Sequence, residues 1–405
     1  MKINKRCFTP LLAVALFATA TAAQAKVFQV SPGESIQAAI DQASPGDTIM
    51  VEPGVYHEDA TSRFGLRITT DNLRLIGKPR MGEGDEGKVI LTPATPPVEG
   101  GGVQQTGVYA APEGCSPEEQ VGDEFCENNR LEGFYIRGFT VYGYEWNGIQ
   151  TRFVDDFTIV NNVAHSVGIN GIYPTISANG LVENNVAYGT MDTAMWVAAS
   201  ENVKVIGNDL SGAPIGLEVN VSVDIEVKRN YVHDNTVGIA LFHPNTAGNL
   251  PRPDMGNWLV KNNNVYDNNL ENPAPPDSFQ GGLPRGIGIL LLGVSDNVVE
   301  KNIVEDNNFV GIGMLDWCTA AAFIGRDCEN NPPITDPQSS NNLISRNTLE
   351  RNGLDPDETD ASFLAADLTY ADGGDSSGNC FENNKPEGYT YISTEEDGEL
   401  PTDGC

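Results

Sequence analysis

The feature that most constrains the fold of this chain is an internal repeat. A triplet of the form Asn-x-Val or Asn-x-Leu recurs with spacings of 23, 24, 22, 33, 39 and 45 residues, at Asn161, Asn184, Asn208, Asn230, Asn263, Asn302 and Asn347. The longer spacings hold turn-rich insertions, such as HPNTAGNLPRPDMGN after Phe242. A unit of about 22 residues is too small to bury an apolar face alone. The repeat therefore predicts a solenoid of stacked units with insertions in its loops.

Each unit contains two short runs of β-forming residues. One run precedes the anchor asparagine, as VKVI does before Asn208, and the other begins with a small residue and an apolar one, as in Gly171-Ile172 and Ala194-Met195. Runs of this length bounded by Asn, Asp and Gly indicate strands. Stacking joins such strands into parallel sheets around one apolar core. The predicted fold class is therefore all-β.

The anchor asparagines have a structural explanation. Asn tolerates positive φ at a sharp bend, and its amide can bond the Asn of the units above and below. A second set follows four of the anchors by five residues, at Asn235, Asn268, Asn307 and Asn352. Buried polar groups in proteins are normally hydrogen-bonded. We therefore expect both sets to form ladders inside the solenoid.

The ends of an open solenoid need covering, because they expose strand edges and apolar interior. Ile36, Ala39, Ile40 and Ala43 form the stripe of a short amphipathic helix, which we expect to cap the first coil. The solenoid is predicted over residues 26–352. The acidic segment 353–405 is predicted to cap or flank the last coil.

The opening SIQAAIDQASPGDTIMVEPGVY, followed by tandem units of the form N-x-V…GI, resembles exported bacterial repeat proteins of the right-handed parallel β-helix, pectin-lyase-like class. The resemblance covers about Val27 to Asn352 and points to a subgroup without an assigned reaction. It implies a single right-handed parallel β-helix. It does not imply one activity, because this architecture hosts polysaccharide lyases, C5-epimerases, hydrolases and adhesins.

The catalytic signatures of that class match this sequence poorly. The Asp-Pro-His-Asp run of alginate-type epimerases is absent, and the nearest fragments are His233-Asp234 and His243-Pro244-Asn245. The best candidate for the paired aspartates of polygalacturonases is Asp155-Asp156. These residues occupy a turn position that recurs as Asn179, Asn202 and Asp224, so we interpret them as structural.

Residues 1–25 have the pattern of a cleaved signal peptide. Three basic residues precede the apolar run 11–23, and Ala23-Gln24-Ala25 matches a cleavage site. We expect export to the periplasm or the exterior, without membrane insertion, because no later apolar stretch is long enough to span a bilayer. The chain has 24 basic and 56 acidic residues, and loss of the leader leaves a net charge near −35. Such acidity disfavours nucleic acid as a partner.

Six cysteines remain after the leader, and they form sequence-local pairs. An even count in an exported protein indicates disulfides. Locality favours the pairs Cys115–Cys126, Cys318–Cys328 and Cys380–Cys405, although six cysteines allow fifteen connectivities. Metal binding is disfavoured because no CxxC or CxxH spacing occurs.

Equivalent positions of successive coils should stack into rows. Two residues after the start of the small-apolar pair, one row changes from aromatic or polar residues to apolar ones: Gln150, Tyr173, Trp196, Glu218, Ala240, Leu290 and Gly313. Aromatic side chains beside a carboxylate are typical of sugar sites. We therefore predict a carbohydrate polymer as the partner, bound along the first half of this row.

Two classes of function fit such a groove. The first is a polysaccharide lyase or C5-epimerase, in which Arg152 or Arg252 neutralises a uronate, His165 or Tyr173 removes the C5 proton, and Asp192 or Glu218 acts as an acid or calcium ligand. The second is a non-catalytic carbohydrate-binding, surface or assembly scaffold. In either case the candidate substrate contacts are Trp146, Tyr173, Tyr188, Trp196, His243 and Arg252.

No organic cofactor is predicted. Calcium is a possible exception, because Asp372 and Asp375 lie in a short run of carboxylates and hydroxyls. That run lacks the spacing of an EF-hand, so a flexible acidic loop is the simpler interpretation.

Overall fold

The computed structural model describes residues 24–79, 87–93, 104–242, 255–323, 338–358, 361–374, 376–386 and 388–405. Nearly all of the predicted signal peptide lies outside these ranges. None of the helices in the described ranges is long and apolar enough to cross a membrane.

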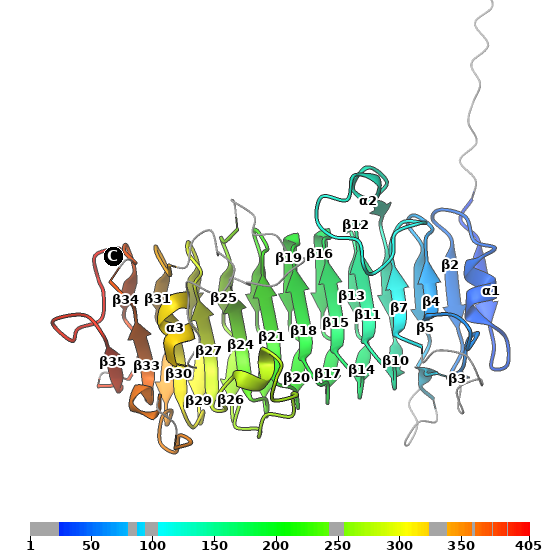
Figure 1. The fold of residues 1–405 in the computed structure, drawn as a ribbon. Helices are drawn as coiled ribbons and strands as arrows, with labels where there is room; N and C mark the ends of the chain where they lie inside the picture. Colours follow the sequence, from blue (N-terminus) through cyan, green and yellow to red (C-terminus); the bar gives the residue numbers. More distant parts are fainter. Residues whose placement is uncertain are drawn as a thin grey trace, which may run out of the picture.

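The described strands form three long parallel sheets, which wind around one axis as a β-helix (Figure 1). In spatial order, sheet 1 contains β1 (Val27–Val30), β2 (Thr48–Val51), β5 (Arg74–Gly77), β9 (Tyr135–Arg137), β13 (Thr158–Val160), β16 (Ala178–Glu183), β19 (Glu201–Ile206), β22 (Glu226–Lys228), β25 (Leu259–Lys261), β28 (Val298–Glu300), β31 (Leu343–Ser345) and β34 (Cys380–Glu382). The short strands β8 (Leu131–Glu132) and β12 (Val154–Asp155) pair beside this path.

Sheet 2 follows sheet 1 within each coil. It contains β3 (Gly54–Tyr56), β6 (Val89–Leu91), β10 (Phe139–Tyr142), β14 (Val163–His165), β17 (Val186–Tyr188), β20 (Asp209–Ser211), β23 (Tyr231–His233), β26 (Asn264–Tyr266), β29 (Ile303–Glu305) and β32 (Thr348–Glu350).

Sheet 3 completes each coil. It contains β4 (Phe64–Ile68), β7 (Thr106–Ala110), β11 (Asn147–Arg152), β15 (Asn170–Thr175), β18 (Thr193–Ala198), β21 (Ile215–Asn220), β24 (Val237–Phe242), β27 (Ile287–Leu292), β30 (Val310–Leu315), β33 (Ala366–Ala371) and β35 (Tyr391–Ser393). The parallel pairing throughout confirms the predicted fold class.

One apolar core fills the solenoid. Residues of successive coils such as Ile172, Met195 and Leu217 point into it from sheet 3 and are fully buried. Side chains alternate between the two faces of a strand, so the intervening residues of sheet 3 face outward. This alternation is what makes an outer face available for a site.

The inner amide ladder differs from the prediction at its first two steps. Asn161 and Asn184 are exposed residues with φ of 54° and 53°, and the ladder uses the residues that follow them, Asn162 and Asn185. The left-handed bend and the inward amide therefore belong to two consecutive positions. In the first two coils both positions are Asn, which made the triplet ambiguous. From Asn208 onward the predicted anchors are the ladder residues.

The ladder continues through the stack with amide-to-amide distances of 2.9 to 3.1 Å, ending at Asn384. The second predicted ladder is also present, from Asn235 through Asn268 and Asn307 to Asn352. The buried asparagine side chains at these corners are thus hydrogen-bonded to one another from coil to coil.

The two ends of the solenoid are built differently. The helix α1 (Ile36–Ile40) lies across the first coil and buries Ile36, Ala39 and Ile40, with Ser35 as its N-cap (Figure 1). At the other end, the structure differs from the expected boundary at residue 352, because β33 and β34 extend sheets 3 and 1. The acidic composition of this segment concealed strands whose inward residues, such as Leu368 and Phe381, are apolar and buried.

Two of the three predicted disulfides join described residues. Cys115 and Cys126 have Cα atoms 5.9 Å apart, and Cys380 and Cys405 have Cα atoms 5.0 Å apart. Cys318 is also disulfide-bonded, but its predicted partner Cys328 lies outside the described residues.

The insertions of the repeat flank sheet 3. The segment after β7 contains α2 (Glu124–Asn128), and the segment after β30 contains α3 (Trp317–Phe323). On the other side, the segment before β27 contains the 3-10 turn η1 (Gln280–Gly282), and the segment before β33 contains η2 (Ser362–Leu364). We call the outer face of sheet 3, which lies between these insertions, the groove.

Candidate active site

The outer face of sheet 3 carries three rows of side chains. The first row is Thr106, Asn147, Asn170, Thr193, Ile215, Val237, Ile287, Val310 and Ala366. The second is Arg67, Tyr109, Gln150, Tyr173, Trp196, Glu218, Ala240, Leu290, Gly313 and Thr369. The third is Arg152, Thr175, Ala198, Asn220, Phe242, Leu292, Leu315 and Ala371.

All three rows change character at nearly the same coil. The first row becomes apolar at β21, and the other two become apolar at β24. We call the outward residues from β4 to β21 the polar half of the groove, and those from β24 to β33 the apolar half. The second row has the register predicted from the sequence, so Tyr173, Trp196 and Glu218 lie on consecutive coils.

Two arginines lie at the start of the polar half. The guanidinium carbon of Arg67 is 4.8 Å from the ring centroid of Tyr109, and burial raises the pKa of Tyr109 while Arg152 and Arg67 oppose that rise. Arg67 donates to backbone carbonyl oxygens of Ile68, Ala111, Pro112 and Cys115. Arg152 is 4% exposed and donates to the carbonyl of Glu119.

Neither arginine has a carboxylate partner among the described residues. A buried cation without a counter-charge is costly. Burial accordingly lowers the pKa of Arg67. The two guanidiniums form a cationic end of the groove that fits an anionic group of a ligand.

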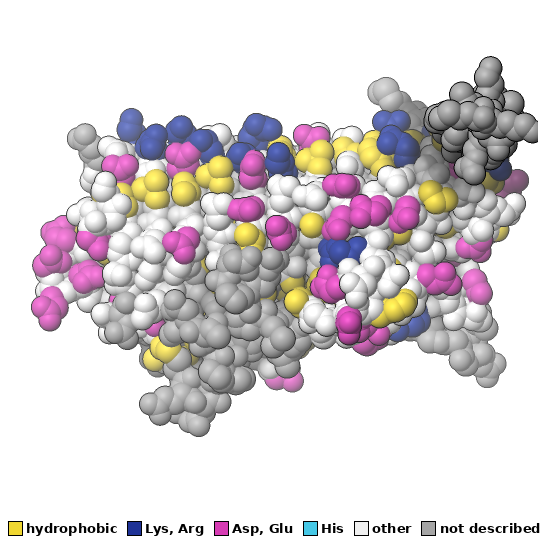
Figure 2. All heavy atoms as spheres, turned by 90° about the horizontal axis from the view of Figure 1, so that it is seen from above, with side chains coloured by type: hydrophobic (Ala, Val, Ile, Leu, Met, Phe, Trp, Pro, Cys, Tyr) yellow, Lys and Arg dark blue, Asp and Glu magenta, His cyan; other side chains and the backbone are white. Residues whose placement is uncertain are grey.

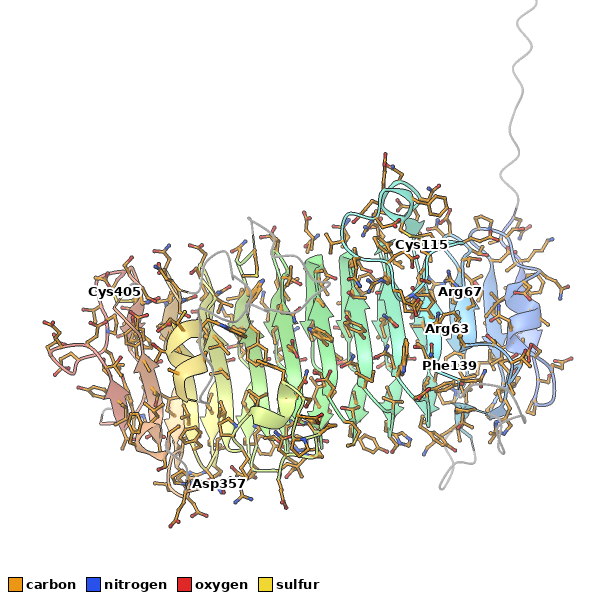
Figure 3. The ribbon with its side chains drawn as sticks, viewed as in Figure 1. Arg63, Arg67, Cys115, Phe139, Asp357 and Cys405 are labelled. Carbon is orange, nitrogen blue, oxygen red and sulfur yellow. A yellow bond between two sulfur atoms is a disulfide. The ribbon has the colours of Figure 1, made fainter. Side chains whose placement is uncertain are left out.

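The segment that contains α2 is fixed over this cationic end. Arg63 pairs with Glu118, and the Cys115–Cys126 disulfide closes the segment on itself. Figure 3 shows Arg63 and Arg67 near the N-terminal end of the solenoid, next to the strand that leads to Cys115. The wall of the groove is therefore held by charge, by hydrogen bonds and by a covalent link.

The middle of the polar half is an aromatic pair. The rings of Tyr173 and Trp196 are stacked with centroids 4.6 Å apart and an interplanar angle of 12°. Each ring thus has one face covered by the other, and the ring edges face the groove. Burial raises the pKa of Tyr173, Arg152 lowers it, and Glu218 and Asp192 raise it further, which places these groups in one electrostatic cluster.

The far end of the polar half is a pair of carboxyl groups. The hydroxyl of Thr193 lies 3.2 Å from Asp192 Oδ1 and 3.3 Å from Glu218 Oε2, and Asn220 Nδ2 donates to Glu218 Oε1 over 2.7 Å. Burial raises the pKa of Asp192 to about 6, against hydrogen bonds from Thr193 and Gln280 that lower it. Burial and the charge of Asp192 raise the pKa of Glu218 well above its ordinary value. The pair therefore holds a proton up to a higher pH than isolated carboxyl groups do.

Buried polar atoms without a hydrogen-bond partner gather along this half of the groove. Among the described residues they include Thr106 Oγ1, Tyr109 Oη, Arg152 Nε, Asn170 Oδ1, Trp196 Nε1 and Asn220 Oδ1. Unpaired buried polar groups cost free energy, and each needs an explanation. The polar half is therefore less favourable for stability than a fully paired surface would be.

The structure separates the predicted site residues into two faces. Arg152, Tyr173, Asp192, Trp196 and Glu218 share the groove. His165 and Tyr188 instead lie on the outer face of sheet 2, where His165 stacks between Tyr142 and Tyr188 at centroid distances of 4.9 and 4.7 Å.

The other predicted contacts have different positions. Trp146 precedes β11, with the guanidinium carbon of Arg63 5.5 Å from its ring centroid, so it lies beside the cationic end. His243 and Arg252 fall outside the described residues.

Calcium binding at Asp372 and Asp375 stays a prediction. The carboxylate of Asp372 accepts hydrogen bonds from Gly374 and Ser376 of its own loop, and Asp375 lies outside the described residues. Cys380, Glu382 and Cys405 have a geometry that could hold a metal ion, but the two cysteines are joined in a disulfide.

The sequence analysis missed Arg67, Tyr109 and Gln280. Arg67 and Tyr109 extend the second row toward the N-terminus, where the units are too irregular for the Asn triplet to mark them. Extending the row by strand register, one coil at a time, would have found them. Gln280 reaches Asp192 from an insertion, and no repeat positions it.

The exterior of the molecule is mainly acidic, whereas one end of the groove is cationic. Figure 2 shows acidic side chains spread over one face of the molecule and Lys and Arg gathered along one edge. The strong net acidity is thus a surface property, whereas Arg152 of the groove is buried and Arg67 is half-buried. Local charge, and not net charge, decides what the groove attracts.

Comparison with known proteins agrees with this architecture. The family model described as the right handed beta helix region matches residues 125–251 and 252–398. The chain belongs to the right-handed β-helix family. Among solved structures of β-helix proteins, it is similar to the A-module of the Azotobacter vinelandii mannuronan C-5 epimerase AlgE4, with a TM-score of 0.61 and 16% identity over 91% of this chain and 93% of that one.

A second β-helix structure shows the same level of likeness. The A-module of the A. vinelandii mannuronan C-5 epimerase AlgE6 matches with a TM-score of 0.52 and 16% identity, over 89% of this chain and 93% of that one. No curated protein matches the sequence significantly. At such identities, the likeness to these structures extends to the fold.

Proposed function

We propose that the polar half of the groove binds a uronate-containing polysaccharide and acts on it as a lyase or a C5-epimerase. The observation that carries the proposal is the carboxyl pair of half-buried Asp192 and buried Glu218, both within hydrogen-bond distance of the hydroxyl of Thr193. Carboxyl groups whose environments raise their pKa values are typical of general acids. The similar folds of two mannuronan C-5 epimerases support this class of substrate.

The ends of the polar half have complementary chemistry. Arg67 and Arg152 would pair with a sugar carboxylate, since Arg152 is buried and Arg67 is half-buried, and neither has a carboxylate partner in the part of the chain that the structure describes. Pairing would stabilise the anion that forms at C5 when its proton is removed. Tyr173 lies between the cationic end and the carboxyl pair, and we assign its phenolate, the form that the charge of Arg152 favours, to accept that proton.

The two reactions share their first step and differ in the second. After a base removes the C5 proton, departure of the C4 oxygen with a proton from the acid gives an unsaturated uronate and a new chain end. Return of a proton to the opposite face of C5 gives the epimer instead, with no bond of the polymer broken. The protonated member of the carboxyl pair supplies the proton in either case.

Incubation of the mature protein with alginate, polygalacturonate and a neutral glucan tests the proposal. Absorbance at 235 nm detects the unsaturated product, and NMR detection of deuterium at C5 in D₂O detects epimerisation. We expect Glu218→Gln to lower turnover by at least about 100-fold while the polymer is still retained. Glu183→Gln, on sheet 1, is the matched control and should retain full turnover.

Three outcomes would contradict parts of this proposal. Unchanged turnover in Glu218→Gln would remove that residue from the acid role. Retention of a polymer without either product would identify the protein as a non-catalytic carbohydrate-binding scaffold. Failure to retain any polymer would contradict the carbohydrate site itself.

A further inference from the structure

The outer face of sheet 2 lies outside the proposed site and presents exposed apolar side chains. Tyr188, Tyr231 and Ile303 are 39%, 49% and 44% exposed, and all three point outward from this sheet. The face continues through the coils from β10 to β32 (Figure 1). Exposed apolar patches on proteins commonly mark a surface that another molecule covers.

The two bends that border sheet 2 carry opposite charges. Each bend holds one residue per coil at positive φ. The bend that leads into sheet 2, which we call the basic bend, has φ values of 56°, 58° and 57° at Arg229, Lys301 and Arg346. The bend that leads out of it, the acidic bend, has φ values of 54°, 51° and 57° at Asp234, Asp267 and Asp306.

The backbone does not account for the cations of the basic bend. In earlier coils the same position is occupied by Asn161, Asn184 and Gly207, which are residue types that adopt positive φ readily. Long side chains are uncommon at such φ values. Arg229 and Lys301 therefore occupy this position against the local conformational preference, and their charge is the property that sets them apart.

The charges of the basic bend are not neutralised within the chain. Arg229 and Lys301 have no ion-pair partner among the residues that the structure describes, and Arg346 has only Glu300, at 3.8 Å.

The acidic bend likewise keeps a negative charge. Asp267 has no ion pair in the described part of the chain, and its pKa is raised by burial and by the charges of Asp306, Asp234 and Glu305. Arg351 pairs with Asp306 and also contacts Glu305 and Glu350, so one cation faces three carboxylates. Both borders of the face therefore have charge available for a partner.

This charge pattern is self-complementary for one arrangement of two copies. Arg229 and Asp234 flank β23, and Lys301 and Asp306 flank β29, so opposite charges border the same strand. A two-fold axis parallel to the solenoid would place the basic bend of each copy against the acidic bend of the other, coil for coil. Antiparallel solenoids packed through the same face would instead bring like charges together. An isologous interface needs such self-complementarity.

We propose that the outer face of sheet 2 is the interface of a homodimer in which two parallel solenoids pack about a two-fold axis. Arg229 then pairs with Asp234 of the partner subunit, and Val186 packs against Tyr188 of the partner subunit. Between β9 and β32, the connections from sheet 1 into sheet 2 are one or two residues long, so no insertion separates the copies on the basic side.

The size of the face fits a reversible dimer. Eight strands from β10 to β32 form it. At about 4.8 Å per strand and about 3.3 Å per residue, the face is about 38 Å long and about 16 Å wide between the bends. Roughly 600 Å² per partner lies at the lower end of specific interfaces. Both copies are acidic, but charges more than about 8 Å apart are screened at physiological salt, so the contacts across the face decide.

Sedimentation equilibrium of the full mature protein at physiological salt tests the proposal. We expect a monomer–dimer equilibrium with a micromolar Kd that weakens as salt rises. The variant Arg229→Glu/Lys301→Glu and the variant Asp234→Lys/Asp267→Lys should each weaken self-association by at least about 10-fold, because like charges then meet across the face. Lys204→Glu, on the outer face of sheet 1, is the matched control and should dimerise like the wild type.

Mixing the two charge-reversed variants is the decisive measurement. Their altered bends complement each other, so the mixture should form a heterodimer although neither variant dimerises alone. Circular dichroism checks that each variant is folded, and Arg229→Gln/Lys301→Gln, which removes charge without reversing it, should also weaken the wild-type dimer if a reversed variant does not fold.

Four results would overturn the dimer. They are a wild type that stays monomeric at about 0.1 mM, well above a micromolar Kd, a dimer that survives both charge reversals, and a mixture of folded variants that stays monomeric. The fourth is a monomer that retains heparin through Arg229 and Lys301, which would assign the basic bend to an anionic polymer instead. None of these results affects the polysaccharide site, because the substitutions lie outside the groove.

Discussion

The two halves of the groove are built on the same backbone and differ only in what their outward side chains do. In the apolar half, Phe242, Leu292 and Trp317 pack into a second hydrophobic cluster outside the solenoid. In the polar half, several buried donors and acceptors of the described residues have no hydrogen-bond partner. Packing in the apolar half stabilises the fold, whereas unpaired buried polar groups in the polar half destabilise it. The proposed ligand site rests on this difference.

The largest expected effect is on the free energy of unfolding. It is tested at two neighbouring positions of the third row, Phe242 in the apolar half and Asn220 in the polar half. Phe242 is 2% exposed and its ring contacts Phe279 edge-on at 5.6 Å, so Phe242→Ala should lower the free energy of unfolding by about 3–5 kcal/mol. Asn220→Ala should lower it by less, about 1–2 kcal/mol, because the variant loses the bond from Nδ2 to Glu218 Oε1 but also removes the unpaired Oδ1. Urea unfolding of both variants checks this. Equal losses would remove the energetic distinction between the halves.

The interior should show no such distinction. Asn185 and Asn302 occupy the same ladder under the polar and the apolar half, with amide contacts of 3.0 Å in both places. Replacing either by Leu should lower the free energy of unfolding by about 1–3 kcal/mol, since each leaves neighbouring polar groups unpaired. Asn264→Leu, on the outer side of sheet 2, is the control. A large difference between the two ladder variants would extend the comparison into the core.

Ligand retention should depend on the polar half alone. Trp196→Ala removes a half-buried ring whose Nε1 is unpaired, and should weaken polysaccharide binding by about 10-fold with little change in melting temperature. Trp258→Ala provides the contrast, because this ring is 1% exposed in the core and its loss should destabilise the fold strongly. Unfolding of the Trp196→Ala protein would show that the outer ring is structural.

The smallest expected effect is on the pH dependence of stability. Because burial raises the pKa of Asp192 to about 6, the folded protein binds this proton more tightly than the unfolded chain. Stability from this group is therefore present below pH about 4 and is lost as pH rises through about 6. Melting temperatures across this range should fall less in Asp192→Asn than in the wild type. Asp224→Asn, at an exposed turn, should not change the slope; an unchanged slope in Asp192→Asn would contradict the burial of that carboxyl.

The sequence predicted the solenoid because every coil has the same structural requirements. Each coil needs inward apolar residues, a left-handed bend and an inward amide, so the same pattern appears many times along the chain. The second row followed from this periodicity, and Gln150, Tyr173, Trp196 and Glu218 were placed in register. The prediction was wrong where two neighbouring asparagines shared the bend, at Asn161 and Asn184.

The composition of the candidate site could not be predicted in the same way, because its contacts do not repeat along the chain. Sequence spacing put His165 near Tyr173, but the chain turns between β14 and β15, and the two side chains lie on different sheets. The insertions position Gln280 and Trp317 beside the groove, and no periodicity determines how an insertion folds. Sequence periodicity alone determined the β-helix and the order of residues along its rows. Only the tertiary structure decided which rows share a groove and which groups in it are buried and unpaired, because burial depends on loops that pack from distant parts of the chain.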